Sequence, residues 1–355
     1  MNPLDQRTAR VLVTILLFAA VLGFIYLARK PLIIFLFAIL FAYLLEPIIV
    51  RVEPRVRNSR GLAILVVYVI GLALCAGIGL AAGPRIASEG RSLAHSAPEL
   101  YQKIVSGNIA WQIGERRGWS QETEARVQQF LAAHRQAFLG YVSGLASRAA
   151  ELATNVGWIA LIPILAIFFL KDKASFGVAA QQLLGDNRER RMLRGIISDL
   201  DEMLSHFVRA QLYLALLSGF VYTLGLTALR MQYTFVLGTI GGFLEFIPVI
   251  GPLIAAVLIL SVAFTVNYPH LVFVLLFLGA WRVCQDYVIS PRVLGGRVEL
   301  HPLATLFGIL VGGEIGGVVG VYLAIPIMAT IRILWKRLYQ TGSVTAGPVA
   351  PKRAA

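Results

Sequence analysis

The sequence alternates long apolar runs with short, mostly basic connections, and this pattern predicts the helices before any motif is considered. A helix needs about 20 predominantly apolar residues to cross roughly 30 Å of hydrocarbon. Most runs reach that length, so we predict an all-α, polytopic integral membrane protein with about six to eight transmembrane helices. The runs lie at about 11–28, 32–50, 61–83, 152–170, 207–229, 233–265, 271–290 and 303–334.

The amino-terminal runs indicate the orientation of the chain. The first run follows Arg7 and Arg10, as in a signal peptide, but it is long and another span follows at once. We therefore interpret it as an uncleaved anchor. Four arginines crowd the connection at 51–60, which the positive-inside rule places in the cytoplasm. Both termini are then predicted to be cytoplasmic.

Four regions follow from the polarity of the sequence. We expect three transmembrane helices in 1–83, an extracytoplasmic amphipathic helical insert in 84–151, a core with broken helices in 152–335, and a disordered cytoplasmic tail in 336–355. The insert has apolar residues at three- and four-residue spacing. This pattern fits helices on the membrane surface or between subunits, and a ligand-binding domain is the alternative.

Glycine and proline interrupt two late segments, 232–265 and 303–331. Proline removes a backbone hydrogen bond, and such backbone is tolerated at membrane depth only inside protein or beside a water-filled cavity. Each segment is either one long kinked span or a re-entrant hairpin of two half-helices. The hairpin arrangement places Arg292 and Arg297 in a cytoplasmic loop, and the positive-inside rule therefore favours hairpins.

Three carboxylates lie at apparent membrane depth and are the candidate site residues. A carboxylate at the bilayer centre costs about 2.5–3.5 kcal/mol on insertion scales, so it is expected to face a cavity or a partner. Glu245 lies just before Pro248, Gly251 and Pro252, which would create the ends of two half-helices. The alternative is a kink at a bundle interface, with Glu245 neutral or hydrogen-bonded to a neighbouring helix.

The other two carboxylates also have structural alternatives. Glu314 is surrounded by glycines, which equally suit close helix packing; these are Gly312, Gly313, Gly316 and Gly317. Asp286 follows Arg282 by four positions, so the two form either an internal ion pair or an ion-handling site. We hypothesise that the two interrupted segments face each other around a polar site that contains Glu245 and Glu314.

Composition and charge agree with a membrane setting. The chain is 57% hydrophobic and 14% charged, whereas soluble domains are about 25% charged. The formal charge of +13 suits the anionic inner leaflet of a lipid bilayer. Nucleic acid is not an expected partner, because the basic residues form no long stripe.

Several functional classes lack their motifs. The sequence has no GxxxxGK[ST] loop for ATP, no HExxH and no GxSxG, and its five histidines are scattered without metal-ligand spacing. We therefore predict no cofactor, no bound metal and no enzymatic activity.

Two motifs carry a family resemblance. "FIPVIGPLIA" together with "DYVISPRVLGGRVELHPLATLFGILVGGEIGGVVGVYLAIPI" resembles the signature of the autoinducer-2 exporter family of bacterial polytopic membrane proteins. The resemblance covers roughly 10–335. The family pattern falls on Pro248, Gly251, Pro252, Asp286, Pro291, Gly295, His301, Pro302, Gly312, Gly313, Gly316, Gly317, Gly320 and Pro326.

The resemblance implies a transporter of the bacterial inner membrane. Family members are described as exporters of the quorum-sensing signal autoinducer-2, some as sodium or lithium/proton antiporters, and a homo-oligomer, with a pentamer as the suggested form, is implied. We predict a secondary transporter that uses an ion gradient to export a small solute such as autoinducer-2. Sodium(lithium)/proton antiport is the alternative, and a membrane scaffold without transport is the third reading.

Overall fold

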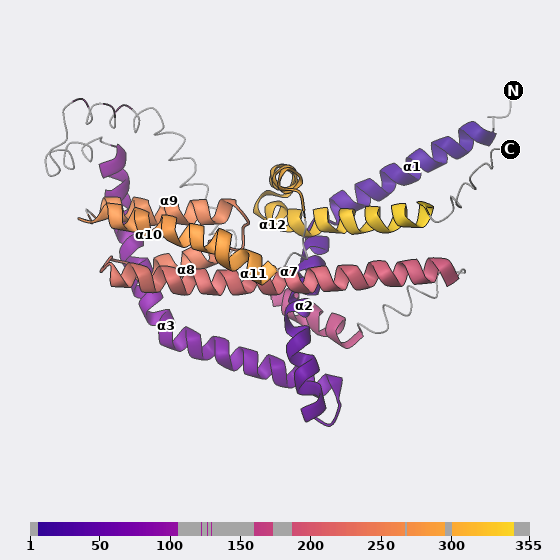
Figure 1. Ribbon diagram of the computed structural model, residues 1–355, viewed down its shortest axis with the longest axis horizontal. Coiled ribbons are helices and arrows are strands. Elements are labelled where there is room, and N and C mark those ends of the chain that lie inside the picture. The colour runs from indigo at the N-terminus through magenta and orange to yellow at the C-terminus, as the bar shows by residue number, and fades with distance from the viewer. Residues whose placement is uncertain are drawn as a thin grey trace, which may run out of the picture. The chain divides into compact units, whose positions relative to one another are not determined.

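A computed structural model of the chain describes residues 6–105, 122, 126, 129, 160–172, 187–266, 268–294 and 300–343 (Figure 1). The described residues are helical apart from short turns, and no strand occurs among them. The chain divides into two compact units. The first comprises 1–67 and 149–178, and the second comprises 68–148 and 179–355.

In the first unit one arginine links three helical segments. It contains α1 (Gln6–Leu27), α2 (Arg29–Val52), the 3-10 helix η1 (Glu53–Arg55), the start of α3 (Arg60–Val105) and the helical residues 160–172. Arg60 donates from Nε to the carbonyl oxygen of Leu170 at 2.6 Å and from its terminal nitrogen to both oxygens of Glu46 at 2.9 and 3.0 Å. This cation therefore joins three helical segments of the first unit.

The second unit contains the broken segments. After the remainder of α3, its described helices pack around a core built from α7, α8, α9 and α10, and Leu226, Leu237, Ile259 and Val274 are almost completely buried there. Figure 1 labels these helices. Their bounds are α7 (Asn187–Ala228), α8 (Thr234–Leu244), α9 (Ile250–Thr265), α10 (Leu271–Cys284), the π-helix η2 (Gln285–Ile289), α11 (Ser290–Leu294) and α12 (Pro302–Ser343).

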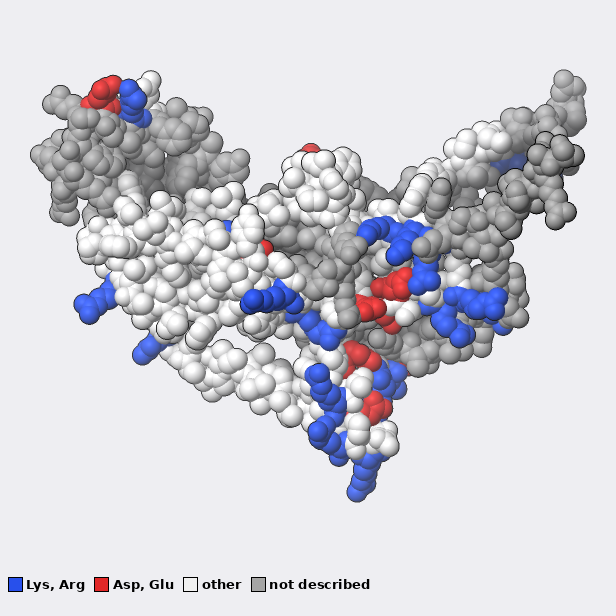
Figure 2. Space-filling view, in the orientation of Figure 1, with Lys and Arg blue, Asp and Glu red and all other residues white. Residues whose placement is uncertain are grey.

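The described helices have the length and polarity of membrane spans. By length and composition six of them, including the interrupted α12, are apolar enough to cross a bilayer, which confirms the predicted all-α polytopic membrane fold. Only residues 160–170 of the predicted span at 152–170 are described, so this number is not a count for the whole chain. The visible face over α9 and α10 carries few charged side chains, and Lys and Arg gather around the connection from α2 to α3 (Figure 2).

Both interrupted segments fold as helical hairpins. The first divides into α8 and α9, and α8, at about 17 Å, is too short to cross hydrocarbon. The second, α12, has a non-helical residue, Gly317, with φ 56° and ψ −138°. A Cβ on Gly312 would collide with the backbone of Gly320, because the two arms of α12 run back along each other. Of the two predicted arrangements, the structure has the hairpins rather than long kinked spans.

Two helices extend past the boundaries that polarity suggests. α3 continues through residue 83 to Val105 without a break, and α12 continues past residue 335 to Ser343. Hydropathy marks where membrane-compatible side chains end, whereas a helix continues as long as its backbone hydrogen bonds do. Most of the predicted insert and residues 344–355 of the predicted tail lie outside the described residues.

Candidate functional site

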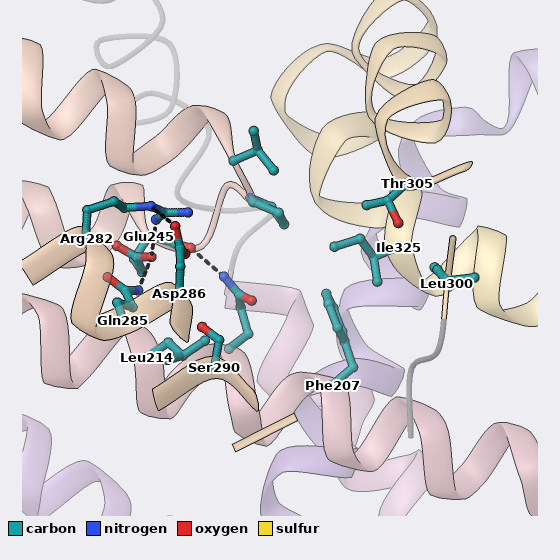
Figure 3. A pocket seen from close by; sticks show the side chains of 13 residues that line it. Phe207, Leu214, Glu245, Arg282, Gln285, Asp286, Ser290, Leu300, Thr305 and Ile325 are labelled. Carbon is teal, nitrogen blue, oxygen red and sulfur yellow. Dashed lines mark hydrogen bonds and ion pairs between the residues drawn. The ribbon is translucent and has the colours of Figure 1, made fainter. Parts of the chain in front are cut away.

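A cavity of about 250 Å³ lies inside the second unit, beside the turn between α8 and α9 (Figure 3). Its lining comes from α7, the α8–α9 turn, the continuous α10–η2–α11 segment, and α12 with Leu300 two residues before it. The lining combines carboxylate, guanidinium, amide and hydroxyl groups with apolar side chains. The residues are Phe207, Gln211, Leu214, Glu245, Pro248, Val249, Arg282, Gln285, Asp286, Ser290, Leu300, Thr305 and Ile325.

The sequence around Glu245 requires the helix to end there. Pro248 has no backbone N–H to donate, and Val249 has a φ of 66°, which a β-branched residue rarely adopts. A Cβ on Gly251 would collide with the carbonyl oxygen of Leu244, so only glycine fits the return into α9. These residues stop α8 and hold Glu245 at the tip of the first hairpin.

Two glutamine side chains hold Glu245. The amide of Gln211 on α7 donates to the backbone carbonyl of Glu245, and the amide of Gln285 on η2 donates to its Oε1 atom. Exposure is 5% for Glu245, 7% for Gln211 and 1% for Gln285. Among the described residues, Oε2 of Glu245 and Oε1 of Gln285 have no hydrogen-bond partner. These contacts leave two buried acceptor oxygens without a donor, and the buried hydroxyl of Ser218 on α7, which also has no partner among the described residues, is close enough to serve Glu245 as one.

Arg282 lies between two carboxylates. Its Nε atom is 2.7 Å from Oδ2 of Asp286, and one terminal nitrogen is 3.8 Å from Oε1 of Glu245. Figure 3 shows the guanidinium directed toward both carboxylates. The side chains of Arg282 and Asp286 are 38% and 41% exposed, against 5% for Glu245. Two carboxylates and one guanidinium give the cavity a formal charge of −1 when all are ionised.

The π-helix η2 brings two polar side chains to the cavity. η2 follows α10 without interruption and contains Gln285 and Asp286, both of which line the cavity. A π-helical turn inserts an extra residue into an α-helix, and such turns occur frequently at functional sites. The wide turn lets Arg282, Gln285 and Asp286 all reach the cavity from one continuous segment.

The structure places the predicted residues of the first hairpin at or beside the cavity. Glu245, Pro248 and Asp286 line it. Gly251 and Pro252 are buried in the first turn of α9, immediately after the turn that carries Glu245.

The predicted residues of α12 have other positions. Gly312 and Gly320 allow the two arms to touch, Gly313 lies near Val321, and Gly317 makes the break. Pro326 is buried in the second arm, and Gly316 is exposed beside the break. Exposed positions are also found for Pro291 on α11 and for His301 and Pro302 at the start of α12, whereas Gly295 lies outside the described residues.

The two hairpins meet, but they do not bring their carboxylates together. Ile247 in the α8–α9 turn packs against the buried cluster of Ile309, Val321 and Ala324 on α12, and the centroids of the Phe246 and Tyr322 rings lie 6.5 Å apart.

Glu314, in contrast, is exposed near the Gly317 break and does not line the cavity. The hypothesis that Glu245 and Glu314 share one polar site is therefore not met.

Sequence reasoning missed the polar uncharged residues of the cavity. Gln211, Gln285, Ser290 and Thr305 all line it. The signal for the glutamines was available, because an amide within an apolar helix needs a partner on another helix. Among the described residues, no group of three or more His, Cys, Asp or Glu side chains could hold a metal ion.

Comparisons with known proteins identify the family. A family profile described as "AI-2E family transporter" matches residues 15–340. The chain is 26% identical over 309 residues to "Putative transport protein YrrI" of Bacillus subtilis, covering 86% of this chain and 84% of that protein. It is also 24% identical over 330 residues to a "Sodium-lithium/proton antiporter" of Halobacillus andaensis, covering 89% and 92%. The chain therefore belongs to the AI-2E family of transporters.

Proposed function

We propose that the protein is a secondary transporter in which the cavity at Glu245 binds the coupling ion and a small polar solute. The observation that supports this most is the buried carboxylate of Glu245, whose Oε2 atom has no hydrogen-bond partner among the described residues beside a cavity. Buried charges in membrane proteins are rare and usually mark ion or substrate pathways.

The environment of Glu245 suits reversible binding of a cation. Burying an ionised carboxylate costs several kcal/mol unless partners compensate it. Gln285 compensates one oxygen, and the guanidinium at 3.8 Å is too distant for a hydrogen bond. A bound proton or monovalent cation would supply the missing partner of the second oxygen, Oε2. Broken helices in transporters hold ions near such ends, and their movement couples ion binding to solute transport.

The cavity is larger than an ion requires. Its volume of about 250 Å³ leaves space for a solute of several heavy atoms. Gln211, Ser290 and Thr305 offer amide and hydroxyl groups, and Phe207 and Leu214 offer apolar surface. These groups suit a small polyhydroxylated solute such as autoinducer-2, and we propose export as the direction.

Exchange of sodium or lithium for protons is the second candidate. The two buried acceptor oxygens and the formal charge of −1 favour a cation as the cargo itself. The name of the Halobacillus relative supports the same reaction. In this case Glu245 would bind the metal cation and the proton alternately.

We further propose a location in the bacterial inner membrane with both termini cytoplasmic. The arginines at 51–60 and Arg292 support this orientation. The two hairpins then enter the membrane from opposite sides as re-entrant segments. The family resemblance supports a homo-oligomer.

The experiment is gradient-driven flux in proteoliposomes that contain the full chain. The wild type is compared with Glu245→Gln, Glu245→Asp and the control Glu122→Gln, a glutamate that is 77% exposed and pairs with Arg126 four positions along. Labelled autoinducer-2 is followed with and without a proton gradient, and a pH-sensitive dye reports sodium- or lithium-driven proton movement.

The outcomes separate the two candidates. Gradient-dependent autoinducer-2 flux that Glu245→Gln abolishes supports coupled solute transport. Cation-driven proton movement alone, lost in the same variant, supports antiport. Activity of either kind that survives Glu245→Gln contradicts the proposed site.

A further inference from the structure

We propose that Arg282 is a tethered internal cation that competes with a monovalent cation for Glu245. The inference rests on the proposed role of Glu245 as the ion site. It adds that Arg282 sets the cation affinity of Glu245, and that the ion pair between Arg282 and Asp286 leaves Glu245 free to bind a cation.

The guanidinium is shared unequally between its two carboxylates. Its contact with Asp286 is a short, charge-assisted pair at 2.7 Å, whereas its contact with Glu245 is an ion pair at 3.8 Å without a hydrogen bond. Asp286 is on the next turn of the same segment, and Glu245 is on the first hairpin. A small rotation of the Arg282 side chain therefore transfers it from one carboxylate to the other.

The two carboxylate partners of Arg282 differ in how deeply they are buried. The side chain of Glu245 is 5% exposed, whereas those of Arg282 and Asp286 are 38% and 41% exposed. A pair formed in the drier environment is stronger than the same pair near solvent. Arg282 is therefore an effective competitor for Glu245, and Asp286 holds it back in the more exposed position.

Few charged or titratable groups surround Glu245 among the described residues. Among the described residues that line the cavity, Glu245, Arg282 and Asp286 are the charged ones. α7 contributes the neutral Gln211 to the lining, and Tyr222 on the same helix is a further titratable neighbour of Glu245. An entering cation meets the Arg282–Asp286 pair first and occupies Glu245 when the guanidinium stays on Asp286.

The competition predicts opposite effects for the two partners. Arg282→Gln removes the competitor, so cation binding becomes tighter. Asp286→Asn removes the contact that holds Arg282 back, so the guanidinium moves onto Glu245 and cation binding becomes weaker. If each charge acted on the bound cation independently, the two substitutions would change the cation affinity in the same directions, but their changes in binding free energy would add in the double variant. In the competition, Asp286→Asn loses its effect when Arg282 is absent.

The test is a double-mutant cycle for equilibrium binding of radioactive Na⁺, repeated with Li⁺ as competitor, on the purified full chain. We expect Arg282→Gln to tighten binding about tenfold and Asp286→Asn to weaken it about tenfold, with the double variant within about threefold of Arg282→Gln. Arg292→Gln on exposed α11 is the matched control and should leave binding unchanged. Arg282→Met, which also removes the charge, is used in the same cycle if Arg282→Gln does not fold.

Additive effects, or Arg282 variants that bind Na⁺ no more tightly, overturn the inference while the role of Glu245 stands. No Na⁺ or Li⁺ binding in any folded variant overturns the inference, whereas the role of Glu245 in coupling is overturned by gradient-driven flux that survives Glu245→Gln.

Discussion

The side-chain amide of Gln285 donates a hydrogen bond to Oε1 of Glu245, although the two residues are 40 positions apart in the sequence. Gln285 lies on the π-helix η2, and Glu245 lies at the tip of the α8–α9 hairpin. One buried hydrogen bond therefore joins the two irregular elements that form the cavity. Any change in the position of the hairpin must alter this bond, which makes it a link between ion binding and movement of the hairpin.

Gln285→Met should impair transport more than stability. The variant keeps the volume of the side chain but removes its donor, and a hydrogen bond to a charged group contributes about 1.5–3 kcal/mol. We expect gradient-driven flux to fall about tenfold or more. Tyr287→Phe, at a residue of the same π-helix that is 79% exposed, is the control. Unchanged flux in Gln285→Met would show that this bond is not part of the transport cycle.

The contact between the arms of α12 should not tolerate a methyl group. Gly312→Ala or Gly320→Ala places a Cβ against the backbone of the opposite arm, and overpacking of this kind costs about 1–3 kcal/mol. The melting temperature in detergent should fall for both variants. Gly279→Ala on α10 is the control, since a Cβ there meets nothing within 4 Å. Equal melting temperatures for all three would contradict the hairpin structure of α12.

The sequence predicts the features that depend on neighbouring residues, and it does not predict the contacts between residues far apart in the chain. The all-α membrane fold and the two breaks follow from local patterns, because hydropathy and the glycines and prolines near Glu245 and Gly317 act within a few residues. Glu245 was predicted for the same reason, as a carboxylate beside a break.

The pairing across the cavity could not be predicted in this way. Glu245 meets Gln285 only after α8–α9 and α10 have packed together, and no local pattern encodes the π-helix that turns Gln285 inward. Glu314 has the same local signature as Glu245 but is exposed, because the position of the α12 contact decides which side chains it encloses.

Glu89 should stabilise the start of the first hairpin. Its Oε2 atom accepts hydrogen bonds from the backbone N–H groups of Phe235 and Val236 at 3.0 and 3.1 Å, in the first turn of α8. These N–H groups have no partner within their own helix, and losing such a cap costs about 1 kcal/mol. Glu89→Ala should therefore accelerate amide hydrogen exchange at 235–236, and Glu89→Gln should do so less. Exchange that is equal to wild type in Glu89→Ala would rule out this capping role.

The pair between Asp199 and Arg337 should contribute little and should depend on salt. Its two hydrogen bonds, at 2.8 and 2.9 Å, join α7 to α12, but both side chains are more than a third exposed. Exposed pairs typically contribute about 0.2–1 kcal/mol. A double-mutant cycle with Asp199→Asn and Arg337→Gln should give a coupling free energy in this range that decreases in 1 M salt. A larger coupling that is insensitive to salt would contradict a solvent-screened pair.

The most direct test compares the two glutamates of the broken segments in one assay. Glu245→Gln and Glu314→Gln make the same chemical change, but only Glu245 lines the cavity. In proteoliposomes of verified protein content and orientation, the measurement is transport driven by an imposed proton gradient. We expect Glu245→Gln to abolish it and Glu314→Gln to retain it. Transport that survives Glu245→Gln and is lost in Glu314→Gln would contradict the assignment of this cavity as the transport site.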